Sequence, residues 1–208
     1  ALPILLAMSS KGWRNLTEIV SRGFIEGQQL SIPCVQKEWI LEQSEDLIVL
    51  LGQHSDVGKM LCSFNPQKAE PLLEAWIEKF GNRVYLALSR TERIGEEDFI
   101  QQAVKLAAKY QIGVVAHNDV HFIEQDDFEA HEARVCIADG YVLVDDKRPK
   151  NYSTEQYFKT GEQMSELFSD IPSAIENTYQ IAKRCNVALQ LGTYFLPDFP
   201  IPDGYTID

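Results

Sequence analysis

Long hydrophobic runs are missing from this sequence. The longest apolar stretches, residues 2–8 and 47–52, fall far short of the roughly 20 residues that a membrane-spanning helix needs. No charged segment precedes the first stretch, so we do not expect it to be a signal peptide. These absences favour a protein that neither spans a membrane nor is exported.

Cysteine is scarce and scattered. The four cysteines form no C-x-x-C pair, and they stand far apart at Cys34, Cys62, Cys136 and Cys185. Zinc sites are typically built from close pairs, and disulfide-rich scaffolds are shorter and denser in cysteine. We therefore expect four reduced thiols and a cytoplasmic protein.

Basic residues are outnumbered. Lysine and arginine total 19 against 31 aspartates and glutamates, which gives a formal net charge of −12. A free-standing nucleic-acid binder usually carries the opposite balance, because it must neutralise phosphates. An anionic membrane surface is disfavoured for the same reason. The length of 208 residues suits one domain, or at most two small ones.

Three common functional motifs are also absent. The sequence has no G-x-x-x-x-G-K-[ST], no G-x-G-x-x-G and no G-x-S-x-G. The sequence therefore lacks the main signatures of phosphate-binding loops, dinucleotide-binding folds and nucleophile elbows.

Short apolar runs alternate with amphipathic segments in the first part of the chain. We expect buried strands at residues 3–8, 46–51, 83–88 and 113–116. We expect amphipathic helices at residues 11–22, 67–80 and 96–110. This alternation predicts an α/β fold with parallel strands.

The later part of the chain changes character. Helices are expected at residues 126–138, 162–168 and 171–185. Residues 194–208 contain three prolines and predict an extended exit segment.

Functional groups in parallel α/β folds gather at the carboxyl ends of strands. Asp119 and His121 follow the fourth predicted strand, and their i, i+2 spacing would point both side chains the same way in an extended segment. A carboxylate with a neutral imidazole suits zinc, manganese or iron. The alternative is a polar turn that caps the strand.

Other polar residues follow the predicted strands. His117 precedes Asp119, while Gln53 and His54 follow the second strand, so all three are candidates for the rim of the same site. A solvated loop is the simpler interpretation of His54. His131 is expected on a helix surface, with a supporting role at the site as the alternative.

Several segments, in this order and spacing, carry a resemblance. They include residues 115–122 (VAHNDVHF), 130–135 (AHEARV), 147–153 (KRPKNYS), 169–174 (SDIPSA), 181–186 (IAKRCN) and 192–197 (GTYFLP). With residues 12–16 (GWRNL) and 56–58 (DVG), they resemble the amino-terminal PHP (polymerase and histidinol phosphatase) domain of bacterial DNA polymerase III alpha subunits. The resemblance covers essentially the whole chain.

The resemblance implies a fold. That family has a seven-stranded, TIM-like α/β barrel with mainly parallel strands, surrounding helices and, here, a helical carboxyl-terminal part. Residues 1–192 would form a PHP domain that lacks its first strands. Residues 193–208 would form an extended exit segment toward the polymerase core of the same parent chain.

The resemblance also implies a metal site. Canonical members hold three metal ions, with ligands that begin at an H-x-H motif on the first strand, and this chain has no such motif. Only Asp119 and His121 fill ligand positions, which implies a remnant of a zinc or manganese site. Gln53 stands where relatives carry a ligand, and Leu2 falls where some carry a histidine. No catalytic residue is expected on this chain.

By the same resemblance, the chain would be part of a nucleotidyltransferase that replicates DNA, with its magnesium-binding palm outside this region. The PHP region would support the polymerase core and dock the proofreading exonuclease subunit, meeting DNA only in the holoenzyme. The alternative is a metal-dependent phosphoesterase, acting as an intrinsic 3'–5' exonuclease or pyrophosphatase. The chain alone is expected to extend no primer and, with an open sheet edge, to self-associate or be marginally stable.

Overall fold

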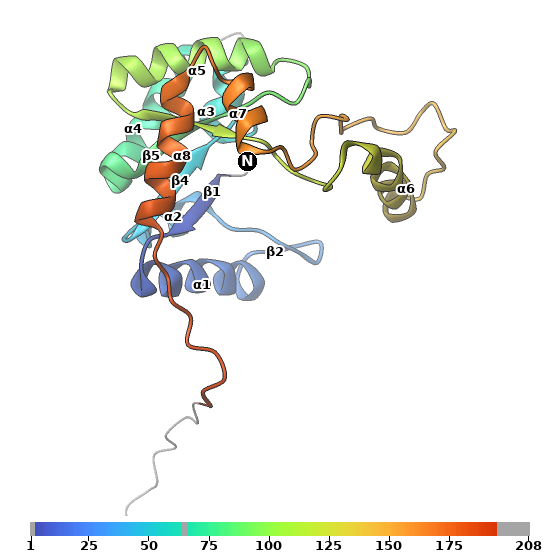
Figure 1. Ribbon diagram of the computed structural model, residues 1–208. Helices are drawn as coiled ribbons and strands as arrows, with labels where there is room; N and C mark the ends of the chain where they lie inside the picture. The colour runs from blue at the N-terminus through green and yellow to red at the C-terminus, as the bar shows by residue number, and fades with distance from the viewer. Residues whose placement is uncertain (1–2, 64–65, 195–208) are drawn as a thin grey trace, which may run out of the picture.

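The structure of the protein, a computed structural model, describes residues 3–63 and 66–194. Its centre is a four-stranded sheet in the order β1-β4-β5-β6 (Figure 1). The strands are β1 (Ile4–Ala7), β4 (Leu47–Leu51), β5 (Val84–Ser89) and β6 (Gly113–His117). All four lie where the apolar runs predict them, and the α/β class is confirmed.

One strand departs from the predicted direction. β4, β5 and β6 are parallel, but β1 runs antiparallel to β4, with Ile4 opposite Leu50. The prediction of a parallel first strand was therefore wrong. An apolar run indicates that a strand is buried, but it does not indicate the direction of the strand. The direction of β1 relative to β4 depends on the path of residues 8–46 between the two strands. Within the described residues the sheet is open, with β1 and β6 at its edges.

Both faces of the sheet are apolar. Alternate residues of β4, such as Val49 and Leu51, join the larger core under α3 (Asp56–Leu61), α4 (Ala69–Phe80) and α5 (Glu96–Tyr110). Residues of opposite parity form a second core, which Ile181 of α8 (Pro172–Arg184) covers. Every residue of β4 is buried, because helices lie on both sides.

The longer helices agree with their predictions to within a few residues. α5 spans the predicted range, with Glu96, Glu97 and Asp98 in its first turn. The others with more than six residues are α1 (Ser10–Ile25), α4, α6 (Phe128–Asp139), α7 (Gly161–Leu167) and α8. No described helix is long and apolar enough to cross a membrane.

Short elements escaped the sequence analysis. They are the hairpin of β2 (Gln28–Gln29) and β3 (Ile32–Pro33), the helices α2 (Lys37–Glu42) and α3, and the 3-10 turns η1 (Pro66–Lys68), η2 (Gly81–Arg83) and η3 (Gln125–Asp127). Each has six residues or fewer, which is too short for a periodic pattern of apolar residues to be recognised in the sequence.

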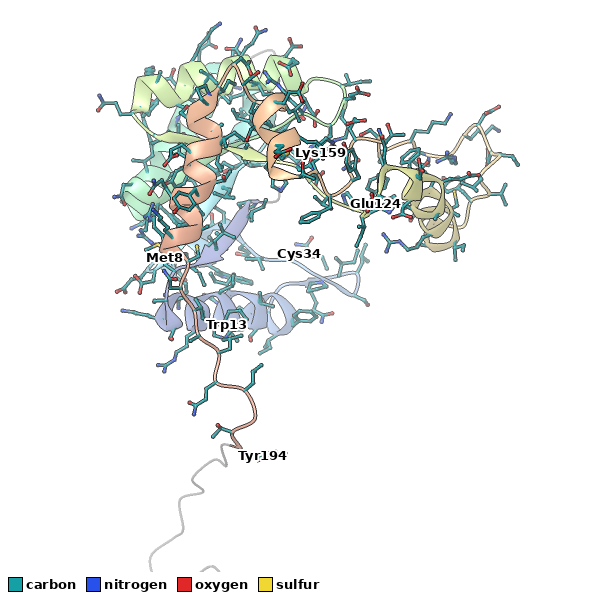
Figure 2. The ribbon with its side chains drawn as sticks, in the orientation of Figure 1. Met8, Trp13, Cys34, Glu124, Lys159 and Tyr194 are labelled. Atoms are coloured by element: carbon teal, nitrogen blue, oxygen red, sulfur yellow. The ribbon has the colours of Figure 1, made fainter. Side chains whose placement is uncertain are left out.

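Residues 120–159, here called the arm, leave the body of the molecule after β6. Figure 1 shows α6 and its loop standing apart from the sheet, joined to it by two extended segments. These segments meet at a parallel bridge between Phe122 and Tyr157. Figure 2 shows Glu124 where the chain enters the arm and Lys159 where it returns toward α7. The predicted exit segment, residues 194–208, lies outside the described residues after Tyr194.

Candidate functional site at the carboxyl ends of the strands

A cavity of about 250 Å³ lies at the carboxyl ends of β4, β5 and β6. Four residues that the sequence singles out line it: Gln53, His54, His117 and Asp119. They lie at the end of β6 or just after β4 and β6, and the parallel arrangement brings them to one edge of the sheet. Ile4 of the antiparallel β1 also contributes to the wall.

His121 does not line this cavity. Its Nε2 lies 3.7 Å from Oδ1 of Asp119, so the two side chains are neighbours, although Asp119 is not in the extended conformation that the i, i+2 prediction assumed. Its ring lies edge-on to Tyr152, with 4.8 Å between ring centroids, and 5.4 Å from the ring of His131. His131 is 5% exposed, so its predicted place on a helix surface was wrong. The rings of His121, Phe122 and Tyr152 lie close to it.

The carboxylate of Asp119 has two strong partners. Nη2 of Arg93 lies 2.8 Å from Oδ2 of Asp119, and Nε2 of Gln156 donates to the same oxygen at 3.1 Å. Asp119 adopts a left-handed backbone conformation with φ 44°, which aspartate tolerates better than most residues. The side chain is therefore held by a permanent cation and an amide.

Arg93 is itself fixed by a buried carboxylate. Glu96 is 4% exposed and accepts hydrogen bonds from the backbone nitrogen of Thr91 at 2.6 Å and from its hydroxyl at 2.7 Å. The same carboxylate lies 3.4 Å from Nε of Arg93. Glu96 thus shapes the turn between β5 and α5 and aims the guanidinium at Asp119.

Gln156 ties the returning arm to the site. Its side chain is fully buried, and its Oε1 accepts a hydrogen bond from the backbone nitrogen of Ser153 at 3.0 Å. Its backbone carbonyl accepts from the nitrogen of His121 at 2.9 Å. The hydroxyl of Ser153 donates to the carbonyl of Thr91. Three separate segments therefore close around Asp119.

His117 favours its neutral form. Burial lowers its pKa below the usual value of 6.5, Asp119 raises it in part, and Arg93 lowers it. Its Nδ1 lies 3.4 Å from the hydroxyl oxygen of Ser89. His54 is exposed on its loop, in accord with the simpler interpretation of a solvated residue.

These side chains do not fit a metal ion well. Within residues 3–63 and 66–194, no three histidine, cysteine, aspartate or glutamate side chains are placed to share one ion. The best candidate ligand, Asp119, already faces the Arg93 guanidinium, and His121 belongs to the aromatic cluster. A zinc ion usually takes at least three protein ligands, so no chemical step is assigned to a metal here.

Sequence reasoning missed Arg93, Glu96 and Gln156. Acidic residues are favourable in the first turn of any helix, so the acidic start of α5 did not single out Glu96 as a residue of the site. Gln156 lies 37 residues beyond Asp119, in a segment without periodic pattern. No local signal in the sequence could have joined these residues.

Comparisons with known proteins agree with the resemblance. A family model described as "PHP domain" matches residues 2–91. Over 205 residues, 98% of this chain, the sequence is 51% identical to the DNA polymerase III subunit alpha of Pseudomonas fluorescens and 50% identical to that of Pseudomonas aeruginosa. The identity to the corresponding subunit of Escherichia coli K12 is 45% over the same share.

Each of these alignments covers 18% of the relative. The chain therefore spans about 18% of the length of the curated relatives that it matches. High identity over nearly the whole chain, together with the matching family model, establishes common descent. This chain is therefore similar to a region of about 18% of the length of bacterial DNA polymerase III alpha subunits, and its residues 2–91 match the PHP domain.

Proposed function

We propose that this chain serves a replicative DNA polymerase as a structural and docking module. In this proposal the nucleotidyl transfer, with its magnesium ions, belongs to another part of the parent polypeptide. The PHP region supports the polymerase core and docks the proofreading exonuclease subunit. The names of the relatives support the polymerase, and the structure of the site supports the non-catalytic role.

The interaction between Arg93 and Asp119 carries the proposal. A hydrolytic metal site needs ionised carboxylates or neutral imidazoles whose free lone pairs are directed at one point. Here the carboxylate that would lead such a set is bound by a guanidinium, whose charge does not titrate in the physiological range. The arrangement suits a site whose role is to hold three chain segments together.

The charge of the surface supports a protein partner. With a net charge of −12, the chain would repel a phosphate backbone, whereas it could attract a basic protein surface. An excess of acidic residues is expected for a module that contacts DNA only as part of an assembled holoenzyme.

The open sheet supports an incomplete barrel. β1 and β6 lie at the sheet edges, and β1 is only partly buried. We propose that residues 1–192 form a PHP domain that is completed by strands of the longer parent, and that residues 193–208 lead toward the polymerase core.

A metal-dependent phosphoesterase is the second candidate, because the cavity gathers His54, His117 and Asp119. Calorimetric titration of the chain with Mn²⁺ and Zn²⁺, with an assay on a labelled oligonucleotide, separates the two functions. We expect no stoichiometric tight binding and no cleavage. Stoichiometric binding and cleavage that Asp119→Asn abolishes, and that Asp146→Asn leaves intact, would establish the phosphoesterase instead.

Docking is tested directly with the purified exonuclease subunit. We expect a stoichiometric complex with this chain in sedimentation or calorimetry, and no primer extension by the chain alone. Failure to bind, both in this chain and in the intact parent, would refute the docking role.

A further inference from the structure

Helix α1 carries an exposed apolar row on one side. Trp13 is 43% exposed, Val20 47% and Phe24 57%. Their spacings of seven and four residues bring the three side chains to the same side of a helix with about 3.6 residues per turn. Ile19, on another side of α1, is 2% exposed and joins the main core. We call Trp13, Val20 and Phe24 the α1 stripe, and contiguous exposed apolar surface of this kind marks interaction sites.

The charge of α1 differs from that of the whole chain. The helix holds Lys11, Arg14 and Arg22 against one acidic residue, Glu18, in a protein whose net charge is −12. Lys11 and Arg22 already form ion pairs with nearby glutamates. Arg14, next to Trp13 in the sequence, forms no ion pair with any residue in the described part of the chain. An apolar row beside an unpaired arginine suits a ligand that is itself apolar and carries an acidic group.

The carboxyl-terminal sequence has this composition. Residues 185–208 contain three aspartates and no lysine, arginine or histidine. Four large apolar side chains are concentrated in residues 195–201 (FLPDFPI), with Asp198 among them. Because proline fixes its own φ, a segment with Pro197 and Pro200 loses less conformational entropy on binding than an ordinary segment. Proline-containing extended segments are bound by surfaces lined with aromatic side chains, and the α1 stripe has an aromatic ring at each end.

The described chain brings this segment to α1. The backbone nitrogen of Asn186 donates to the carbonyl of Met8 at 3.2 Å, and Ser9 is the N-cap of α1. The chain therefore passes the start of α1 as it leaves α8, a path that Figure 1 shows. Figure 2 shows Tyr194, the last described residue, beyond α1 on the side away from the sheet. Residues 195–201 thus begin close to the helix that carries the stripe.

The lengths of the segments match. The eight residues between Asn186 and Tyr194 can span up to about 28 Å, whereas the stripe from Trp13 to Phe24 is about 17 Å long. Residues 195–201 can span about 20 Å when extended, so they can cover the whole stripe.

The covalent link favours this segment over a separate protein. A stable interface between two proteins takes about 20–30 residues from each side, many more than the α1 stripe offers. A segment joined to the domain by a short tether has an effective concentration of about a millimolar, so even a weak contact is well populated.

We propose that residues 195–201 of this chain close over the α1 stripe as a strap, with Asp198 beside Arg14. The strap removes the three exposed side chains of the stripe from water and fixes the direction in which the chain leaves α8. The contact lies within the 208 residues and needs neither a metal ion nor a second protein, so it does not depend on the proposed function.

Acrylamide quenching of tryptophan fluorescence tests the strap on the 208-residue chain. The protein has three tryptophans, and Trp39 (7% exposed) and Trp76 (2% exposed) are buried, so the quenching constant reports mainly on Trp13. The double variant Phe195→Ser, Phe199→Ser should raise this constant about twofold or more, because it weakens the tethered contact. Tyr205→Ser, beyond the apolar run in the same segment, is the matched control and should leave the constant unchanged.

The charged contact is tested at Arg14. Arg14→Glu should raise the quenching constant in the same way, whereas Arg14→Lys should leave it unchanged. Lys105→Glu, at an exposed position on α5, is the control for the change of net charge and should have no effect.

Equal quenching constants in the unchanged chain and in the double variant Phe195→Ser, Phe199→Ser would overturn the proposal. Protection of Trp13 that disappears on dilution would overturn it in favour of a contact with a second copy of the chain. Exonuclease binding, measured separately on the same variants, tests the proposed function, so the two can fail independently.

Discussion

Nη2 of Arg93 lies 2.8 Å from Oδ2 of Asp119, across the carboxyl ends of two parallel strands. Arg93 comes from the turn after β5, and Asp119 from the segment after β6. Their side chains are 22% and 32% exposed, so water screens this pair less than a surface ion pair. The pair joins the turn after β5 to the segment after β6 at the candidate site.

A double-mutant cycle measures this pair. Arg93→Met, Asp119→Asn and the double variant should give a coupling free energy of about 1–2 kcal/mol in chemical denaturation, because each single change leaves a partly buried polar group without its partner. The exposed pair of Lys11 and Glu45, with a distance of 2.6 Å, is the control. It should couple by less than about 0.5 kcal/mol. Equal coupling in the two cycles would contradict a special role for Arg93.

Gln156 should be important for stability. Gln156→Ala removes the donor to Asp119 and the acceptor for Ser153 from a fully buried position, so we expect a loss of about 2–3 kcal/mol in the free energy of unfolding. Gln125→Ala, at an exposed position in the arm, should change it by less than about 0.5 kcal/mol. Urea denaturation of both variants checks the difference. A mild effect at both positions would show that the arm is not anchored at Gln156.

Gly58 should not tolerate a side chain. A Cβ there would lie 2.2 Å from the carbonyl oxygen of Gly52 and 2.6 Å from that of Gln53, at the rim of the cavity. Gly58→Ala should cost about 1–3 kcal/mol, because backbone atoms must move. Gly161→Ala is the control: nothing lies within 4 Å of its Cβ, and α7 should gain about 0.5–1 kcal/mol. Thermal unfolding of the two variants should therefore move in opposite directions.

The ion pair of Arg90 and Asp170 predicts sensitivity to acid. A hydrogen bond from Arg90 lowers the pKa of Asp170 below its usual 3.8, so the unfolded chain binds this proton more readily than the folded one. The stabilisation is fully present above pH 3.8 and is lost as the pH falls through the lower, folded pKa. Asp170→Asn should reduce stability at neutral pH and flatten its decline below about pH 4. Asp146→Asn, at an exposed position, should alter neither. Urea melts at a series of pH values measure both.

The edge of β1 predicts association or low stability. Ile4–Ala7 are all only partly buried, and the outer edge of this apolar strand has no neighbour among the described strands. We expect light scattering to show a mass that rises with concentration, or a low unfolding midpoint, although the net charge of −12 opposes aggregation. A cleanly monomeric, cooperatively melting chain would show that four strands close a core without help.

Much of the fold could be predicted because a buried strand or helix has a recognisable pattern of apolar residues in its own short segment of sequence. Residues 47–51 and 113–116 are continuous runs without a polar side chain, as expected of strands covered on both faces, and the structure has β4 and β6 there. The helix at residues 96–110 shows its period and its acidic first turn in the sequence. The D-x-H spacing predicted one shared rim for Asp119 and His121; their side chains are neighbours, but Asp119 is not extended and His121 does not line the cavity.

The four strands of the central sheet, the longer helices and the polar groups at the ends of the parallel strands could all be predicted from the sequence. The antiparallel direction of β1, the burial of His131 and the contacts of Arg93 and Gln156 with Asp119 could not. The difference is the distance along the chain over which each feature is set. The spacing of apolar residues indicates which side of a single segment is buried. The partner of a charged side chain instead depends on how segments far apart in the sequence are arranged in the fold. Gln156, 37 residues beyond Asp119, reaches it only because the arm folds back.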